Sequence, residues 1–189
     1  KTARPEKSDT YPMSKITRLE AVLFDLDGTL YDSAHLDRES LRVLLDVDLG
    51  WEEAAYDIDD FLGVPSREVL ERVAPHRVEE LLSKWLDYQD ELREQTHLFP
   101  RVRPTLEVLK ESGLNLGVVT SQNKSELDAT RPHIKLDDLI QVWVSASQVE
   151  NPKPHAEPVL KALGELACRP ENAIFIGDSV TDIQAGRSA

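Results

Sequence analysis

Two aspartates spaced by one residue, Asp25 and Asp27, directly follow an apolar run that begins at Ala21. Such a run is typical of a buried strand in a parallel sheet, which needs apolar cover on both faces. Residues i and i+2 share one face of a strand, so the two carboxylates leave the strand end together. Gly28 tolerates backbone angles that other residues resist, and it lets the chain turn away. Adjacent carboxylates need a counter-ion, and a hard cation such as Mg2+ prefers oxygen ligands.

A second predicted strand, over residues 114–121, ends in the hydroxyl residues Thr120 and Ser121. The hydroxyl of Thr120 and the backbone N–H of Ser121 could both donate hydrogen bonds to a phosphate oxygen. A threonine at a strand end is also common for purely structural reasons, so this signal is weak when it is taken alone.

Two further segments carry charged residues that could join the same site. Lys153 lies between two prolines, which favour an extended chain and present the ammonium in a defined place. A predicted strand over residues 172–179 ends in Asp178, and Asp182 follows one helical turn later, so both can face one site. Asp182 fits equally well as a cap of the helix that begins there. All four predicted strands place these groups near their carboxyl ends, where open α/β sheets bind ligands.

The string DLDGTL at residues 25–30 resembles the first motif of the haloacid dehalogenase superfamily, most of whose members are phosphatases. The resemblance implies that Asp25 is the nucleophile, which forms an aspartyl-phosphate. It implies that Asp27 is the general acid and base and that its backbone carbonyl binds the metal. The expected cofactor is Mg2+, with Asp25, Asp27 and Asp178 as the metal ligands. Because the dehalogenase and phosphonate branches lack the second aspartate, Asp27 argues against both.

The later segments resemble the remaining motifs of the same superfamily. VVTSQN matches the second motif, which implies that Thr120 and Ser121 bind the substrate phosphate. NPKPHAEP matches the third, in which the lysine, here Lys153, stabilises the nucleophile and the transferring phosphoryl group. GDSVTD matches the fourth motif, which implies that Asp178 binds the metal directly and that Asp182 contacts the metal ligands without binding the ion itself.

Hydrophobic periodicity predicts how the chain is organised around these motifs. Strands are predicted at 114–121, 141–147 and 172–179, and helices are predicted from Pro104 to about Gly113, over 158–167 and over 180–189. Strands that alternate with helices indicate a parallel sheet in a three-layer α/β/α, Rossmann-like fold. Between residues 33 and 99 the apolar spacing is helical, with no clear strand. Its stripes comprise Leu41, Leu44, Leu45, Val69, Leu70, Val73, Val78, Leu81, Leu82, Trp85 and Leu86. We therefore expect a flexible segment at 1–18, an α/β core at 19–32 and 100–189, and an inserted helical cap at 33–99.

Composition limits the possible partners of the protein. The 189 residues carry 35 acidic and 22 basic side chains, a net charge of -13, which disfavours nucleic acid as a partner. No run of 18 apolar residues is present, so we expect no membrane span. The single cysteine, Cys168, allows no disulfide framework, which fits a cytoplasmic protein. The oligomeric state cannot be inferred from the sequence.

The resemblance is strongest to phosphoglycolate phosphatase relatives. It implies Mg2+-dependent hydrolysis of a small phosphorylated metabolite, a phosphomonoester. A sugar phosphomutase or a pyrophosphatase of the same superfamily is an alternative, and a non-catalytic binding protein is disfavoured because Asp25 and Asp27 are both present. Substrate specificity is expected to reside in the cap, where four arginines could meet an anionic substrate: Arg38, Arg42, Arg67 and Arg72.

The sequence carries no strand signal after the fourth motif. Members of the resembled family usually continue through a fifth strand and a final helix, which cover one edge of the sheet. We therefore expect the natural chain to continue beyond Ala189 and the strand at 172–179 to lack part of its apolar cover.

Overall fold

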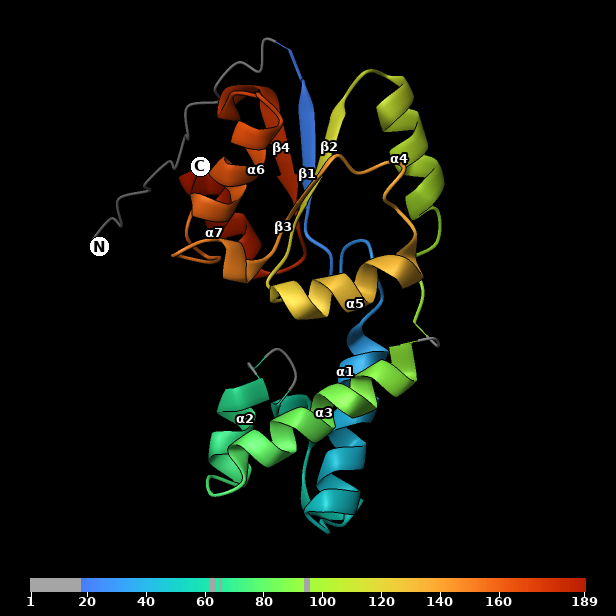
Figure 1. The fold of residues 1–189 in the computed structure, drawn as a ribbon, viewed down its shortest axis with the longest axis vertical. Helices are drawn as coiled ribbons and strands as arrows, with labels where there is room; N and C mark the ends of the chain where they lie inside the picture. The colour runs from blue at the N-terminus through green and yellow to red at the C-terminus, as the bar shows by residue number, and fades with distance from the viewer. Residues whose placement is uncertain (1–17, 62–63, 65, 94–95) are drawn as a thin grey trace, which may run out of the picture.

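Four short parallel strands form the central sheet in the computed structural model, which describes residues 18–61, 64, 66–93 and 96–189. The strands lie in the order β3-β2-β1-β4, so the first strand is central and has a neighbour on each side (Figure 1). Their bounds are Ala21–Phe24 for β1, Asn115–Val119 for β2, Val142–Val144 for β3 and Ala173–Ile176 for β4. The α/β class predicted from the sequence is confirmed.

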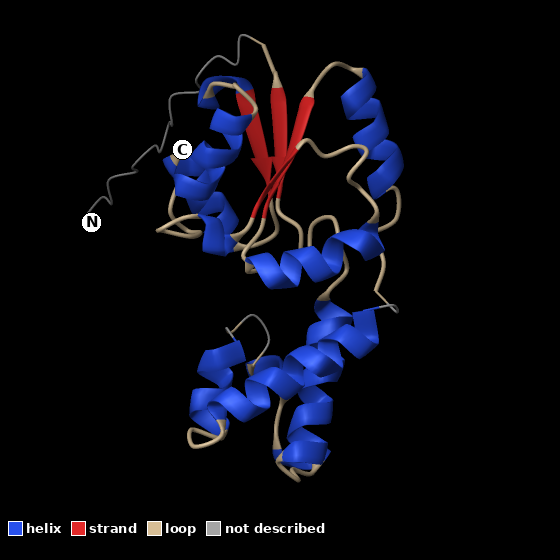
Figure 2. Ribbon diagram, in the orientation of Figure 1, coloured by secondary structure: helices blue, strands red, loops and turns tan. Residues whose placement is uncertain are grey.

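Helices cover both faces of the sheet (Figure 2). The alternation of side chains along β1 explains the two layers, because successive residues of a strand point to opposite faces. Val22 and Phe24 join the core under α4 and α5, whereas Ala21 and Leu23 join the core under α6 and α7. These helices span Val102–Glu111 (α4), Lys124–Ile134 (α5), Glu157–Glu165 (α6) and Val180–Ser188 (α7).

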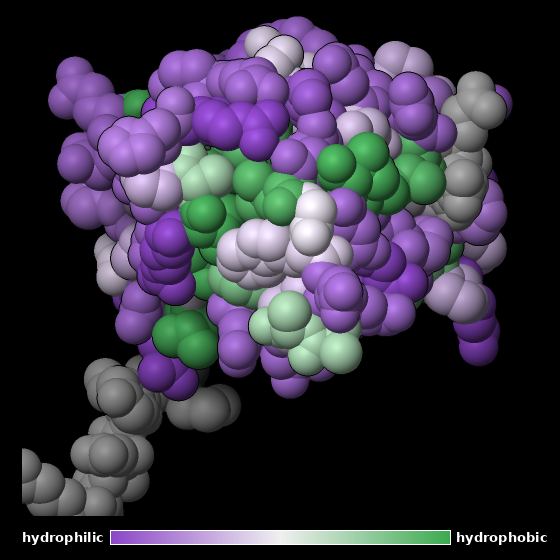
Figure 3. Space-filling view, turned by 90° about the horizontal axis from the view of Figure 1, so that it is seen from below, coloured by the Kyte–Doolittle hydropathy of each residue, from purple (hydrophilic) through white to green (hydrophobic). Residues whose placement is uncertain are grey.

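A separate helical unit follows β1 and lies beyond the carboxyl ends of the strands (Figure 1). It contains α1 (Ala34–Val43), a π-helical turn (Leu44–Asp48), α2 (Ser66–Val73) and α3 (Val78–Leu92). The unit has its own apolar core, formed by Leu41, Leu44, Leu45, Val69, Leu70, Leu81 and Trp85. Its far side is mostly hydrophilic, with apolar side chains gathered near the middle (Figure 3). The unit therefore has an apolar core of its own, separate from the two cores that flank the sheet.

Two chain segments connect the helical unit to the sheet, and they run side by side. Asp32 N donates to His97 O at 3.0 Å, and Tyr31 OH hydrogen-bonds to the hydroxyl of Thr96. Arg93, at the end of α3, is buried and donates from Nη1 to Thr130 Oγ1 of α5 at 2.6 Å. This junction fixes the end of α3 against α5, which follows the second strand of the sheet.

The predicted strands are correctly placed but shorter than expected. Residues 114–121, 141–147 and 172–179 contain β2, β3 and β4, and in each case the last residues leave the ladder, after β3 as the start of a short 3-10 helix (Ala146–Gln148). One helix, α5, was missing from the predicted elements. Among the described residues, no helix combines the length and the apolar character that a membrane-spanning segment needs.

The edge strand β4 has an uncovered apolar side. Ile174 and Ile176 are 39% and 43% exposed, and they lie beside Val22 and Phe24 of β1 in the ladder. They therefore face the same side as α4 and α5, which do not reach this edge. Val180 and Ile183 of α7 are exposed as well.

Candidate active site

Five of the predicted site residues gather at the carboxyl end of the sheet. Asp25 and Asp27 follow β1, Thr120 follows β2 and Asp178 follows β4. Lys153 comes from the loop between β3 and α6, and its ammonium reaches the carboxylate of Asp25. Because parallel strands end at the same edge, residues far apart in the chain meet here.

The ammonium of Lys153 bridges two buried carboxylates. Its Nζ lies 2.5 Å from Asp25 Oδ1 and 2.6 Å from Asp182 Oδ1. The three side chains are between 1% and 6% exposed, so the charges are almost fully removed from water. A buried charge is tolerated only when it is paired in this way.

Burial determines the protonation of Asp25. The pKa of this carboxyl is raised from 3.8 to about 7, mainly by burial, and the nearby ammonium of Lys153 opposes the rise only in part. The negative charges of Asp182 and Asp27 also contribute to the rise. An additional cation at this site would therefore favour the ionised form of Asp25.

Asp27 is held by two groups from the loop after β2. Thr120 Oγ1 donates to its Oδ2 at 3.3 Å, and Gln122 Nε2 donates to its Oδ1 at 3.0 Å. Burial raises the pKa of the Asp27 carboxyl, and hydrogen bonds from Ser33, Gln122 and Thr120 lower it in part. Gln122 was absent from the predicted site residues, whereas Ser121, which was among them, is exposed beside Thr120.

Two glycines allow the acidic groups to approach the backbone. Gly28 has φ +78°, and a Cβ there would lie 2.2 Å from Asp178 Oδ2. A Cβ on Gly177 would lie 2.4 Å from Cγ of Asp182. Any other residue at these positions would displace a carboxylate, so the glycines are required by close contact and, for Gly28, also by backbone conformation.

Three carboxylates could hold a metal ion. Asp25, Asp178 and Asp182 each offer an oxygen, and these oxygens lie within 4.8 Å of one another. An all-carboxylate donor set suits a hard cation such as Mg2+. Asp182 already uses both of its oxygens, because Oδ1 accepts from Lys153 and Oδ2 accepts from Ser179 N at 3.0 Å. The arrangement therefore fits a metal, with Asp182 better placed to support the site than to bind the ion.

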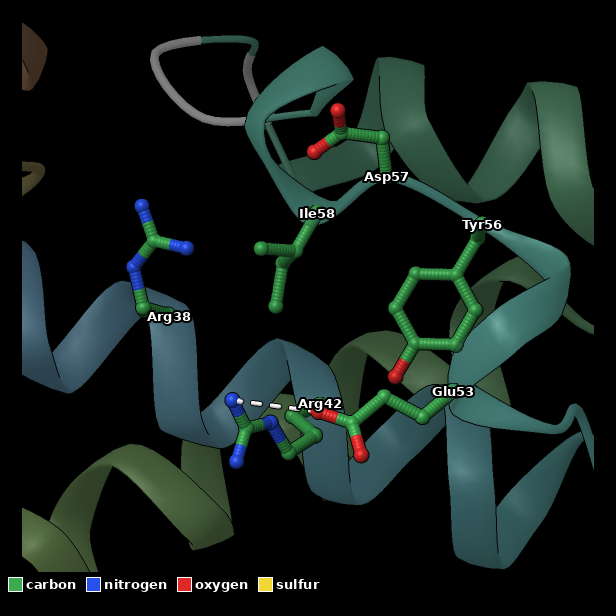
Figure 4. A pocket seen from close by; sticks show the side chains of 6 residues that line it. All are labelled: Arg38, Arg42, Glu53, Tyr56, Asp57 and Ile58. Carbon is green, nitrogen blue, oxygen red and sulfur yellow. Dashed lines mark ion pairs between the residues drawn. The ribbon is translucent and has the colours of Figure 1, made fainter.

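The four arginines of the helical unit all have carboxylate partners. Arg38 pairs with Asp59 and Arg42 with Glu53, the second at 3.7 Å beside a polar pocket (Figure 4). Arg67 pairs with Glu79 at 2.7 Å, and Arg72 pairs with Glu68. These pairs are solvent-exposed, and exposed pairs contribute little to stability. An anionic substrate would have to compete with the carboxylates for each of these arginines.

The metal-free protein is expected to lose stability between pH 5 and pH 8. Burial raises the pKa of Asp25 and of Asp37 to about 7, above the unfolded value of 3.8. A group with a raised folded pKa stabilises the fold fully below its unfolded pKa, and this contribution is lost as the pH rises through the folded pKa. Carboxyls whose pKa is lowered are already ionised between pH 5 and pH 8, so they do not oppose this fall in stability.

Thermal unfolding in a chelator, followed by circular dichroism, should therefore show a lower melting temperature at pH 8 than at pH 5. Added Mg2+ should reduce the difference between the two melting temperatures, since a bound cation favours ionised Asp25. The double variant Asp25→Asn, Asp37→Asn should show a flatter pH dependence. A melting temperature that rises from pH 5 to pH 8 without metal would contradict this account of the buried carboxyls.

Comparison with known proteins agrees with this geometry. A family model described as haloacid dehalogenase-like hydrolase matches residues 22–189. A pyrophosphatase, PpaX, from Bacillus cereus strain B4264 is 33% identical over 176 residues, which cover 91% of this chain and 80% of the relative.

Solved structures with the same fold are also similar to this chain. A subfamily IA hydrolase from Geobacter sulfurreducens superposes with a TM-score of 0.74 at 29% identity, covering 90% of this chain and 83% of that one. A candidate β-phosphoglucomutase from Thermotoga maritima gives 0.77 at 28% identity, covering 90% and 81%. The chain belongs to the haloacid dehalogenase-like hydrolases.

Proposed function

We propose that the protein is a Mg2+-dependent phosphatase that hydrolyses a small phosphomonoester through a phosphorylated Asp25. The observation that carries the proposal is the buried Asp25 carboxylate. It lies against the ammonium of Lys153, with the Asp27 carboxyl following two residues later in the chain. This combination supplies a nucleophile, a fixed positive charge and a separate proton donor at one edge of the sheet.

The first step under this proposal is attack of an Asp25 oxygen on phosphorus. The bond from phosphorus to the leaving oxygen breaks, and the phosphoryl group is transferred to the carboxylate. Lys153, 2.5 Å from Asp25, is placed to offset the negative charge of the transferring group. Mg2+, held by Asp25, Asp178 and the backbone carbonyl of Asp27, would reduce the repulsion between the two anions.

Asp27 serves as the acid and then as the base. Because burial raises the pKa of Asp27, its proton is retained closer to neutral pH and can pass to the leaving oxygen. The resulting carboxylate then takes a proton from the water that attacks the aspartyl-phosphate. Thr120 and Ser121 are proposed to bind the phosphate oxygens, and the Thr120 hydroxyl would exchange its present contact with Asp27 for the substrate.

We also propose that residues 33–99 act as a cap over this site. The helical unit lies at the carboxyl ends of the strands, the edge at which the candidate residues gather (Figure 1). Covering that edge would exclude bulk water while phosphorus reacts, which protects the intermediate from uncontrolled hydrolysis.

The substrate class is open to a direct test. Phosphoglycolate is the proposed model substrate, and pyrophosphate is the second candidate because several PpaX pyrophosphatases are 32–33% identical. A phosphomutase is the third, given the structural similarity to a candidate β-phosphoglucomutase. The products distinguish the three activities. A phosphomonoesterase releases one phosphate per substrate molecule, a pyrophosphatase releases two, and a phosphomutase forms an isomer of its substrate without free phosphate.

Purified protein should release phosphate from 4-nitrophenyl phosphate and from phosphoglycolate in the presence of Mg2+. Excess chelator should stop the release and added Mg2+ should restore it. Release from pyrophosphate alone would replace the monoesterase proposal with the second candidate. Full activity in excess chelator, or no release from any phosphate compound, would overturn the proposed function.

A further inference from the structure

Gln122 lies in the loop between β2 and α5, and it contacts Asp27 both directly and through Thr120. Its side-chain Nε2 donates to Asp27 Oδ1 at 3.0 Å. Its backbone N donates to Thr120 Oγ1 at 3.0 Å, and that hydroxyl donates to Asp27 Oδ2 at 3.3 Å. In the substrate-free protein one loop thus holds both oxygens of the carboxyl group, and the Gln122 contact is the one that remains when the Thr120 hydroxyl turns to the substrate.

The orientation of the Gln122 amide is determined by its partner. The NH2 group faces Asp27 in the structure, as the ionised carboxyl requires, because a carboxylate oxygen accepts hydrogen bonds and cannot donate them. The other end of the amide, Oε1, is buried and has no hydrogen-bond partner in the part of the chain that the structure describes. A buried acceptor without a partner is unfavourable. The bond to Asp27 is therefore the side-chain contact that accounts for a glutamine here.

This contact also determines where the proton of the acid form resides. With an N–H donor facing Oδ1, protonation at that oxygen would set two hydrogens against each other. The proton is consequently placed on Oδ2, because the Thr120 hydroxyl, 3.3 Å away, can rotate from donating to accepting a hydrogen bond, whereas the NH2 group of Gln122 cannot accept one. An acid that holds its proton on one defined oxygen is preorganised to deliver it to the leaving group.

We propose that Gln122 is a positioning residue that holds Asp27 for protonation of the leaving oxygen, an inference that rests on the function proposed above. General acid–base catalysis contributes about 100- to 10,000-fold to a rate, and the contribution depends on how basic the leaving group is. Loss of a positioning contact should therefore matter for a poor leaving group and little for a good one. A structural or substrate-binding role would affect both alike.

The test compares Gln122→Met with the wild type on two substrates of nearly equal shape, phenyl phosphate and 4-nitrophenyl phosphate. Methionine keeps the length of the side chain and removes the N–H donor. We expect kcat/KM for phenyl phosphate to fall about 10-fold or more, and kcat/KM for 4-nitrophenyl phosphate to change by about twofold or less. Asp27→Asn should show the same selectivity more strongly.

Gln141→Met is the matched control. Gln141 is an exposed glutamine whose Oε1 accepts from Leu116 N near the amino end of β2, away from the candidate site. It should leave the ratio of the two kcat/KM values unchanged, and melting temperatures should show that all variants fold.

Equal losses on both substrates in Gln122→Met, or no loss, would overturn the inference if Asp27→Asn remains selective. Wild-type protein without activity, or Asp27→Asn without selectivity, would overturn the proposed function and the inference with it.

Discussion

Asp25→Asn is expected to abolish phosphate release from every substrate that the wild type hydrolyses. The amide has nearly the same shape as the carboxyl but lacks the anionic oxygen that would attack phosphorus. Removing a nucleophile typically costs roughly a thousandfold in kcat or more, so the residual rate should fall to the background of the assay. Initial rates of phosphate release in saturating Mg2+ measure the effect.

The same variant should remain folded. Lys153 keeps a carboxylate partner in Asp182 at 2.6 Å, and the substitution removes a carboxyl that is costly to ionise in its buried position. Asp128→Asn is the control, because Asp128 is half exposed and pairs with Lys124 on the surface. A folded Asp25→Asn protein with wild-type turnover would show that Asp25 is not the nucleophile.

The sequence predicted the sheet and the helical unit because both depend on local patterns. The apolar run at β1 needs cover on two faces, and the structure supplies it by alternating Val22 and Leu23 between two cores. The helical spacing of Leu41, Leu44 and Leu45 likewise predicted a buried stripe, and all three residues lie in the core of the helical unit. Burial of this kind can be inferred from neighbours in the chain.

Helix α5 was missed because its local signals conflict. Pro132 lies inside it and removes a backbone donor, which normally argues against a helix. A usable start signal was nevertheless present. Asn123 accepts from the backbone of Glu126, and Glu126 accepts from the backbone of Asn123, which is a capping box. Tertiary contacts of Leu127 and Ile134 with the sheet then offset the cost of the proline.

The candidate site could be predicted in part, for a similar reason. Residues in motifs, such as Asp25 and Asp178, come with short spacings that indicate a strand end. The contact between Gln122 and Asp27 joins residues 95 positions apart, and no local spacing reports such a pair. The pairs of Arg38 with Asp59 and of Arg42 with Glu53 likewise join separate elements of the helical unit, and they change how these two arginines should be interpreted.

Lys153→Met should have the second largest effect and should impair both stability and activity. Methionine preserves much of the volume but leaves Asp25 and Asp182 buried without their shared cation. Breaking a buried ion pair by removing one partner typically costs about 3–5 kcal/mol in the free energy of unfolding. Urea unfolding measures that loss, and phosphate release should fall together with it, because the ammonium that faces Asp25 is then missing from the site.

The pH dependence separates this account from a simple packing defect. The ammonium lowers the pKa of Asp25, so its removal should raise that pKa further. At pH 5 Asp25 can stay protonated in the folded variant at little cost. At pH 8 the same carboxyl is ionised in the unfolded chain, which favours unfolding. The free energy of unfolding that the substitution removes should therefore be greater at pH 8. Lys161→Met is the matched control, since Lys161 pairs with Glu165 at 3.4 Å on the surface and should change little. Equal destabilisation of the Lys153 variant at both pH values would mean that the ammonium is there for its packing and not for its charge.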